Sequence, residues 1–391
     1  MYFRVEIENE EPPRKPAKFY HTPTDVNYQR IFTLPWNAQK LVNQNTIPRR
    51  QTNPTLKLLW GCLATFILMV AASAIIATPI LFHGQSLFHQ TEKNASIDVS
   101  SSINFCEIDF VDHPWVAEPA NTASSLASYI PLALLGLYGP PSIEWRLPPN
   151  HNRRFRMSYI SLLAIGIGST LLHALLTGLA QGGDELPMLW FMASLSFICL
   201  DLILCGLKKT KGTSVNSKKL QWLFSVSALG ATLVYLLCRE NFLPFYIMFI
   251  AYSWITLISL IMISFVLEWK DITFKTTVLL PLAICTSLHA IFGLISWTSE
   301  MLFCNTIISQ YQNQQESVHG TPNTLDGITH VLLPWFFNRG VHLCWHCSSA
   351  LLAFLGIQTL LAAKGTQLGW GEAHIRWWGA PYVSFQKVKN Q

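Results

Sequence analysis

Five polar residues in largely apolar stretches have types and spacings that suit chemistry. Ser169 and His173 lie four residues apart, and Asp184 follows eleven residues after His173. His342 and His346, much further along the chain, are also four residues apart. Residues at i and i+4 share one face of a helix, so each pair is expected to point in one direction. A fold that brings the two pairs together would create one polar site.

These residue types are the parts of a zinc site that activates water. Three imidazoles hold Zn²⁺ and leave a fourth position for water, whose pKa then falls close to neutrality. A carboxylate such as Asp184 takes and returns protons, and a hydroxyl such as Ser169 donates to the oxygen of a tetrahedral intermediate. Two other interpretations stay open. A histidine in a membrane helix is often a packing residue, and Cys-Trp-His-Cys at 344–347 also fits a thiol metal or redox motif.

The composition predicts an all-α membrane protein. Half of the 391 residues are hydrophobic and only 13% are charged, whereas roughly 25% is usual for a soluble domain. Leu58–Phe82 is an uninterrupted apolar run of 25 residues, enough to cross a hydrocarbon core of roughly 30 Å. It lies too far from the N-terminus for an ordinary cleaved signal peptide. Seven further segments are expected to span the membrane: Val116–Tyr138, Met157–Leu176, Leu186–Leu207, Leu220–Leu237, Phe242–Leu267, Thr276–Trp297 and Val341–Ala363.

Lysine and arginine predict the orientation of these eight segments. All 27 basic residues fall outside the expected helices. The N-terminal arm, every second connection and the C-terminal tail hold 24 of them, whereas the opposite side holds only Lys93, Arg239 and Arg339. By the positive-inside rule, both termini are cytoplasmic. The net charge of +5 therefore reflects topology and does not indicate nucleic-acid binding.

The predicted topology places the five polar residues in the same outer half of the membrane. Ser169 and His173 lie near the outer end of their segment, and Asp184 directly precedes the next one. The histidine pair at 342 and 346 opens the last segment, which begins outside. The site would then face the periplasm, a lumen or the cell exterior.

The same reasoning divides the chain. Residues 1–57 are polar, proline-rich and basic, and are expected to form a poorly ordered cytoplasmic arm. Residues 58–82 are the extra transmembrane helix and 83–363 the seven-helix domain. Residues 364–391 are a cytoplasmic tail whose tryptophans are expected to lie at the membrane interface. Asp201, near the inner end of its segment, is expected to reach towards Lys208.

The combination of motifs resembles the alkaline ceramidases. It consists of Gly-Ser-x-x-x-His at 168–173, Asp-Glu-Leu-Pro-Met at 184–188 and His-x-x-Trp-His at 342–346. The similarity covers roughly Asn104–Ala363 and omits the N-terminal arm and the first helix. The alkaline ceramidases belong to a larger seven-helix hydrolase superfamily that includes the adiponectin-type receptors. The resemblance implies a seven-transmembrane-helix hydrolase bundle, preceded here by one extra N-terminal transmembrane helix.

The resemblance also implies residue roles and a substrate. His173, His342 and His346 would bind zinc, Asp184 would activate water and Ser169 would stabilise the oxyanion. The substrate would be ceramide or a related sphingolipid, entering from the bilayer and cleaved at its N-acyl bond to a sphingoid base and a fatty acid. Two alternatives stay open: a lipid or ligand receptor with structural zinc, and a hydrolase of another lipid acyl bond.

A second block is similar to the calcium-binding segment of the family. Its expected ligands are Asn104, Phe105, Glu107, Asp109 and Glu118. Phe105 would contribute only its backbone carbonyl. Oxygen-rich loops suit a hard cation, whereas the residues alone also fit an acidic solvated loop. The resemblance further implies a disulfide between Cys106 and Cys304, both predicted on the outer side, where disulfides persist.

Several positions depart from the family pattern. Asn104 stands where aspartate is usual, and Asp109 where asparagine is common. Phe105 replaces a tryptophan, and Leu343-Cys344 replaces Ala-Trp between the two histidines. The expected zinc ligands are unchanged by these departures, but the lipid is not specified by the sequence.

Overall fold

A computed structural model describes residues 54–91, 100–103, 105–107, 109–110, 113, 115–139, 149–207, 217–239, 241–266, 274–317, 340–368 and 372–386. The chain divides into two units, Met1–Gln51 and Thr52–Gln391, and every described residue belongs to the second. Most of the predicted N-terminal arm therefore lies outside the described residues. So do Lys208 and Asn104.

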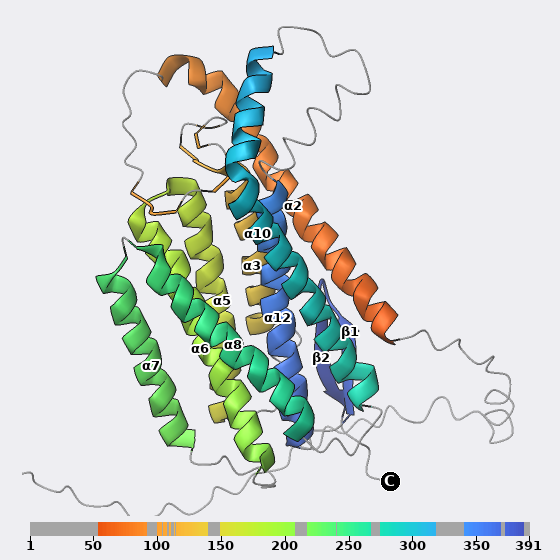
Figure 1. Ribbon diagram of the computed structural model, residues 1–391. Coiled ribbons are helices and arrows are strands. Elements are labelled where there is room, and N and C mark those ends of the chain that lie inside the picture. The colour runs from red at the N-terminus through yellow and green to blue at the C-terminus, as the bar shows by residue number, and fades with distance from the viewer. Residues whose placement is uncertain are drawn as a thin grey trace, which may run out of the picture. The chain divides into compact units, whose positions relative to one another are not determined.

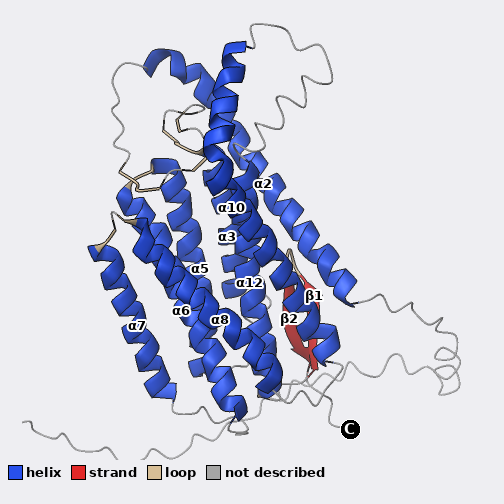
Figure 2. Ribbon diagram, in the orientation of Figure 1, coloured by secondary structure: helices blue, strands red, loops and turns tan. Residues whose placement is uncertain are grey.

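Long helices make up nearly all of the described chain (Figures 1 and 2). They are α2 (Pro54–Thr91), α3 (Pro119–Tyr138), α5 (Pro149–Leu175), α6 (Gly178–Leu207), α7 (Ser217–Leu237), α8 (Phe242–Val266), α10 (Leu280–Ser317), which follows the short π-helix η1 (Lys275–Leu279), and α12 (Val341–Gln367). Each of the eight expected apolar segments corresponds to one of these helices. The predicted all-α class is confirmed for this part of the chain.

Seven of these helices are long and apolar enough to cross a membrane, which makes the chain an integral, multi-pass membrane protein. The remaining one, α3, is the segment expected at Val116–Tyr138. Its first half carries amide and hydroxyl side chains, all buried, including Asn121, Ser124 and Ser125. α3 packs against α2, α5 and α12. Its polar residues therefore face neighbouring helices, which can satisfy them where lipid could not.

Several helices are longer than the apolar runs that predicted them, which corrects two expectations. α2 continues to Thr91, beyond the apolar run that was expected to end at Phe82. Basic residues expected outside the helices lie within them, among them Lys57 in α2, Arg154 in α5 and Lys364 in α12. The physical reason is that a helix does not end where the hydrocarbon ends. Long basic side chains at its ends can reach the interface or a buried partner.

The centre of the bundle is formed by α3 and α12. α12 packs against α10 and α3, while α5 lies between α3 and α6. Most of α12 is buried, with Leu351, Phe354 and Leu355 fully enclosed. The three helices that carry the predicted active-site residues, α5, α6 and α12, are thus held in one packed core.

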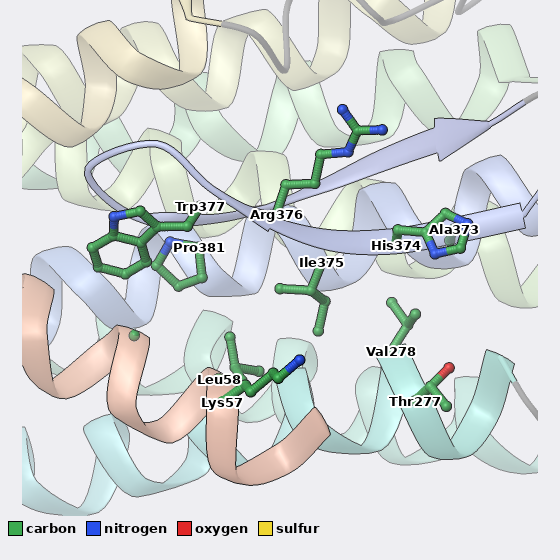
Figure 3. A pocket seen from close by; sticks show the side chains of 11 residues that line it. Lys57, Leu58, Thr277, Val278, Ala373, His374, Ile375, Arg376, Trp377 and Pro381 are labelled. Atoms are coloured by element: carbon green, nitrogen blue, oxygen red, sulfur yellow. The ribbon is translucent and has the colours of Figure 1, made fainter. Parts of the chain in front are cut away.

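A β-hairpin follows α12, which the sequence did not lead us to expect in the tail. Strands β1 (Glu372–Trp377) and β2 (Pro381–Gln386) pair antiparallel around a turn at Gly379. Ile375 points towards α2 and η1, whereas Arg376 extends to the other side of the strand (Figure 3). The hairpin, α2 and η1 enclose a cavity of about 370 Å³. The tail is therefore folded against the bundle, with Trp377 and Trp378 still exposed.

Lys208, the partner expected for Asp201, lies outside the described residues, but Asp201 pairs with two other cations. Its Oδ2 lies 3.1 Å from Nη1 of Arg154 and 3.3 Å from Nζ of Lys364. Lys364 also donates to Gln367, and the Arg154 guanidinium lies over the Phe197 ring. Both cations come from neighbouring helices, α5 and α12, so a buried ion cluster ties these two helices to α6.

Candidate metal centre and active site

Two glycines bring α5 and α6 close together beside the predicted active-site residues. A Cβ on Gly168 would lie 1.9 Å from the carbonyl oxygen of Gly183, so glycine is required there. Small residues of this kind let membrane helices approach closely. Each glycine directly precedes a predicted active-site residue, Ser169 or Asp184. The close crossing therefore brings both side chains to the same cavity.

The end of α5 is fastened to the segment before α3. The carbonyl oxygen of His173 accepts the N–H of Glu118 at 2.9 Å, and that of Ala174 accepts the N–H of Ala117 at 3.0 Å. These bonds satisfy carbonyls that a helix end leaves free. Leu176 then reverses the chain with a φ of 49°, a conformation that side chains other than glycine seldom adopt. His173 is thereby held beside Glu118.

The three predicted histidines form one buried cluster. His173, His342 and His346 are 1%, 3% and 2% exposed. Ring centroids are 4.9 Å apart for His173 and each of the other two, and 4.4 Å apart for His342 and His346. One ring nitrogen of each residue lies within 4.8 Å of the others. Among the described residues, this is the group that could hold a metal ion.

Two of the three rings are held at Nδ1 by a buried carboxylate. Glu118 contacts Nδ1 of His173 through Oε2. Oε2 of Glu300, in α10, lies 2.5 Å from Nδ1 of His342. A carboxylate at Nδ1 keeps the proton on that nitrogen and leaves the lone pair of Nε2 for a metal.

Serines of α3 hold the third ring. Oγ of Ser124 lies 2.7 Å from Nδ1 of His346, and Oγ of Ser125 lies 3.1 Å from the same atom. Ser124 donates its own proton to the carbonyl of Asn121, which leaves its oxygen free to accept from the ring. Oγ of Ser125 is also 3.0 Å from Oγ of Ser169. The predicted oxyanion donor is therefore linked to the histidine cluster through one hydroxyl.

The cluster fits a zinc ion. Nε2 of His342 is buried and has no hydrogen-bond partner, a costly state unless a metal takes its lone pair. Glu118 is fully buried beside Nδ1 of His173, and a cation bound to that histidine would favour the ionised carboxylate.

The predicted active-site residues line one cavity of about 140 Å³. The three histidines, Ser169 and Asp184 all reach it. Asp184 lies inside α6, one and a half turns or so after the helix begins, and not before the helix as expected. The remaining walls are largely apolar and come from α8, α10 and α12, with Phe249, Leu294 and Trp345 among them. The cavity thus joins a polar end to an apolar surface.

The residues of the predicted calcium-binding block make different kinds of contact. Both oxygens of Glu107 accept backbone N–H groups of α3, from Ala120 at 2.8 Å and Asn121 at 2.9 Å, so Glu107 caps that helix. The Phe105 ring lies 4.1 Å from the His342 ring between centroids, tilted by 49°, and the predicted role of its carbonyl as a calcium ligand stays a prediction. Cys106 and Cys304 are joined in a disulfide. Asn104 is outside the described residues.

The sequence model of one family matches most of this chain. The ceramidase profile covers residues 97–384. The chain belongs to the ceramidase family. An alkaline ceramidase of Arabidopsis thaliana is 25% identical over 296 residues, which cover 75% of this chain and 96% of that protein. Alkaline ceramidase 3 of Mus musculus is 26% identical over 235 residues, 60% of this chain and 78% of the relative.

A third relative matches a shorter part of this ceramidase-family chain. A proposed alkaline ceramidase of Dictyostelium discoideum is 29% identical over 167 residues, which are 36% of this chain and about half, 54%, of the relative. The matched region of the family begins after α2, which ends at Thr91. The extra N-terminal helix is therefore an addition to the part that defines the family.

The sequence reasoning missed three residues of the site. Glu300, Ser124 and Ser125 touch histidine rings from helices that are distant in sequence. Some signal for them existed: a glutamate near the end of an apolar segment is costly there, and two serines interrupt the segment that became α3. Neither signal indicates which histidine the residue contacts, because that histidine lies 42 residues away from Glu300 and more than 220 residues away from the serines.

Proposed function

We propose that this protein is a membrane zinc amidase that hydrolyses the N-acyl bond of ceramide or a related sphingolipid. The observation that supports this most is the buried cluster of three histidines beside Ser169 and Asp184, at the polar end of an apolar cavity. The family and its alkaline ceramidase relatives point to the same substrate class. The products would be a sphingoid base and a fatty acid.

The proposed roles follow from the positions of the side chains. Zinc held by His173, His342 and His346 would polarise the amide carbonyl and acidify water. Asp184 would take a proton from the attacking water and return it to the leaving nitrogen. Ser169 would donate a hydrogen bond from its hydroxyl group to the carbonyl oxygen as negative charge develops on that oxygen. One water is consumed, the C–N bond breaks and the amine leaves neutral or protonated.

The cavity supports entry of the substrate from the bilayer. Its apolar wall is made of residues from α8 and α10, both of which are candidate membrane spans. Acyl chains would lie along that wall, while the amide reaches the histidines. Burial of the polar end away from bulk water strengthens each electrostatic contact with the reacting group.

Two further proposals concern the surroundings of the site. By the distribution of basic residues, both termini are cytoplasmic and the site faces the periplasm, a lumen or the exterior. A calcium ion would brace the outer loop at Asp109 and Glu118, close to the zinc ligands. Glycosylation or protease mapping of the segment before Cys106 tests the first, and the calcium content of protein purified without chelator tests the second.

The experiment that tests the function is a hydrolysis panel. Purified protein in lipid nanodiscs is incubated with defined ceramides, an N-acyl amino lipid and an acyl ester, and the released fatty acid and long-chain base are quantified. We expect both products from ceramide and none from the ester. Ester cleavage alone would favour the alternative hydrolase. Zinc-containing protein that binds ceramide and releases nothing would favour the receptor.

A further inference from the structure

We propose that Glu300 is a positioning residue that couples the Cys106–Cys304 disulfide to the metal ligand His342, so that the disulfide-held loop tightens zinc binding. The inference rests on the proposed zinc site. It goes beyond that site in two ways. It assigns a role to Glu300, which is neither a predicted zinc ligand nor a predicted catalytic residue, and it assigns a functional effect to the disulfide.

One carboxylate makes both connections. Oε2 of Glu300 lies 2.5 Å from Nδ1 of His342, and Oε1 accepts the backbone N–H of Cys106 at 3.0 Å. Glu300 is only 2% exposed. A buried carboxylate that loses one donor is free to turn, and it can then no longer fix the ring it holds. The position of Cys106 therefore bears on the orientation of His342.

The disulfide holds Cys106 in that position. Cys304 lies one turn after Glu300 on α10, so both side chains leave the same face of the helix. The Cα atoms of the two cysteines are 5.2 Å apart. Sγ of Cys106 also lies 3.7 Å from the carbonyl oxygen of Glu300. The loop is thus fastened covalently to the turn of helix that carries the carboxylate.

The neighbouring residues of the loop cover the histidine cluster. The Phe105 ring lies 4.1 Å from that of His342 and 5.0 Å from that of His173, between centroids. Glu107 binds the first N–H groups of α3. Displacement of this loop would expose the rings of His173 and His342 and would weaken the cap on α3. The disulfide that holds the loop therefore bears on the geometry of the metal ligands.

His173 provides the internal comparison. Its carboxylate, Glu118, belongs to a segment that is hydrogen-bonded directly to the end of α5. Glu118 also accepts a backbone hydrogen bond from Phe105, the neighbour of Cys106, but Asn121 and the end of α5 hold it as well. We therefore predict that loss of the disulfide acts on zinc mainly through Glu300 and His342, because these other contacts of Glu118 remain.

A double-mutant cycle on zinc affinity tests this coupling. Zinc dissociation constants are measured by chelator competition for wild type, Glu300→Gln, Cys106→Ser/Cys304→Ser and the combination, all in nanodiscs. Partners of metal ligands typically contribute about 10- to 100-fold in affinity, and we expect a loss in that range for each variant. The combination should be no weaker than Glu300→Gln alone, because both changes break one connection.

Controls separate coupling from folding and from the zinc site itself. Cys238→Ser removes an exposed free cysteine and should leave the affinity unchanged. If the cysteine variants do not fold, brief reduction of folded wild type with a phosphine should speed zinc release to a chelator, and should not do so in Glu300→Gln. Unchanged affinity without the disulfide, or full additivity in the cycle, would overturn the coupling alone. Wild type that binds no zinc would overturn the proposed function as well.

Discussion

The helices α5, α6 and α12 carry a buried polar cluster at each end, and the two clusters differ in how their charges are satisfied. At one end, Arg154 and Lys364 share the single negative charge of Asp201, which leaves one net positive charge, and the cluster lines neither of the two cavities described above. At the other end, carboxylates and serines contact the histidines at Nδ1. Nε2 of His342 has no hydrogen-bond partner, and the three rings line a cavity.

The difference shows how to tell a structural cluster from a site. Roughly 28 Å of helix, at about 1.5 Å per residue, separates Arg154 from His173 on α5. Both clusters cost desolvation energy. The ion cluster recovers part of that cost through its own ion pairs, although Oδ1 of Asp201 has no hydrogen-bond partner. The histidine cluster differs because it places three potential metal ligands at a cavity, and that is why we assign chemistry to it.

The largest expected effect comes from removing a metal ligand. His342→Ala should lower ceramide hydrolysis by at least about 1,000-fold, because a bound metal contributes several kcal/mol to the reaction. It should also abolish stoichiometric zinc. His289→Ala removes another histidine, from α10 and outside the cluster, and should change neither. Zinc content and initial rates on the same preparations check this, and equal losses in both variants would contradict it.

Asp184→Asn should have the second-largest effect on turnover. The amide cannot take a proton, so we expect a loss of roughly 10²- to 10⁴-fold in turnover, with zinc content unchanged. Glu185 is the matched control, because it is the adjacent carboxyl and also lines the cavity, but accepts a bond from Gln181. Glu185→Gln should lose less than about tenfold. A reversed order of the two variants would assign the proton transfer to Glu185.

Ser169→Ala should lower turnover by about 100-fold, the lower end of the range for one donor to a developing oxyanion. Ser125→Ala should have a smaller effect, since it touches Ser169 and His346 but donates nothing to the substrate in our account. Rates at saturating ceramide separate the two. A Ser169 variant that raises only KM would mean that the hydroxyl binds the ground state as well as the transition state.

The smallest effect on turnover is expected from the ion cluster. Asp201→Asn leaves the buried Lys364 and the partly buried Arg154 without their counter-charge, and removing one partner of a buried pair typically costs about 3–5 kcal/mol of stability. The thermal midpoint should fall, while zinc content and turnover of the folded protein stay near wild type. Asp201→Asn with Lys364→Met should recover part of the loss. Zinc loss at temperatures below the transition would show that the two ends are coupled.

Much of the fold could be predicted, because the bilayer imposes a simple length requirement. Apolar runs located all eight helices. Their ends could not be placed, because a helix continues into water or protein, as α2 does to Thr91 and α12 to Gln367. The hairpin was missed, although Glu372–Trp377 and Pro381–Gln386 alternate around Gly379 in a pattern typical of strands.

The site could be predicted where its signal was local. The i, i+4 pairs and the charge-based topology placed the three histidines at one end of the bundle, and the structure groups them. Contacts between distant helices could not be deduced: Glu300 with His342, Ser124 with His346, and Lys364 with Asp201. Each contact depends on which sides of two helices meet, and no local sequence pattern encodes this pairing.

The central claim is that the histidine cluster holds a catalytic zinc ion. Its most direct test is to strip metal from the purified, nanodisc-embedded protein and to restore zinc in steps, measuring fatty acid release from ceramide at each step. We expect no hydrolysis at the start, then a linear rise and a plateau at one zinc per chain, and we expect no such rise in His342→Ala. Hydrolysis by the metal-free protein, or none after one equivalent of bound zinc, would contradict it.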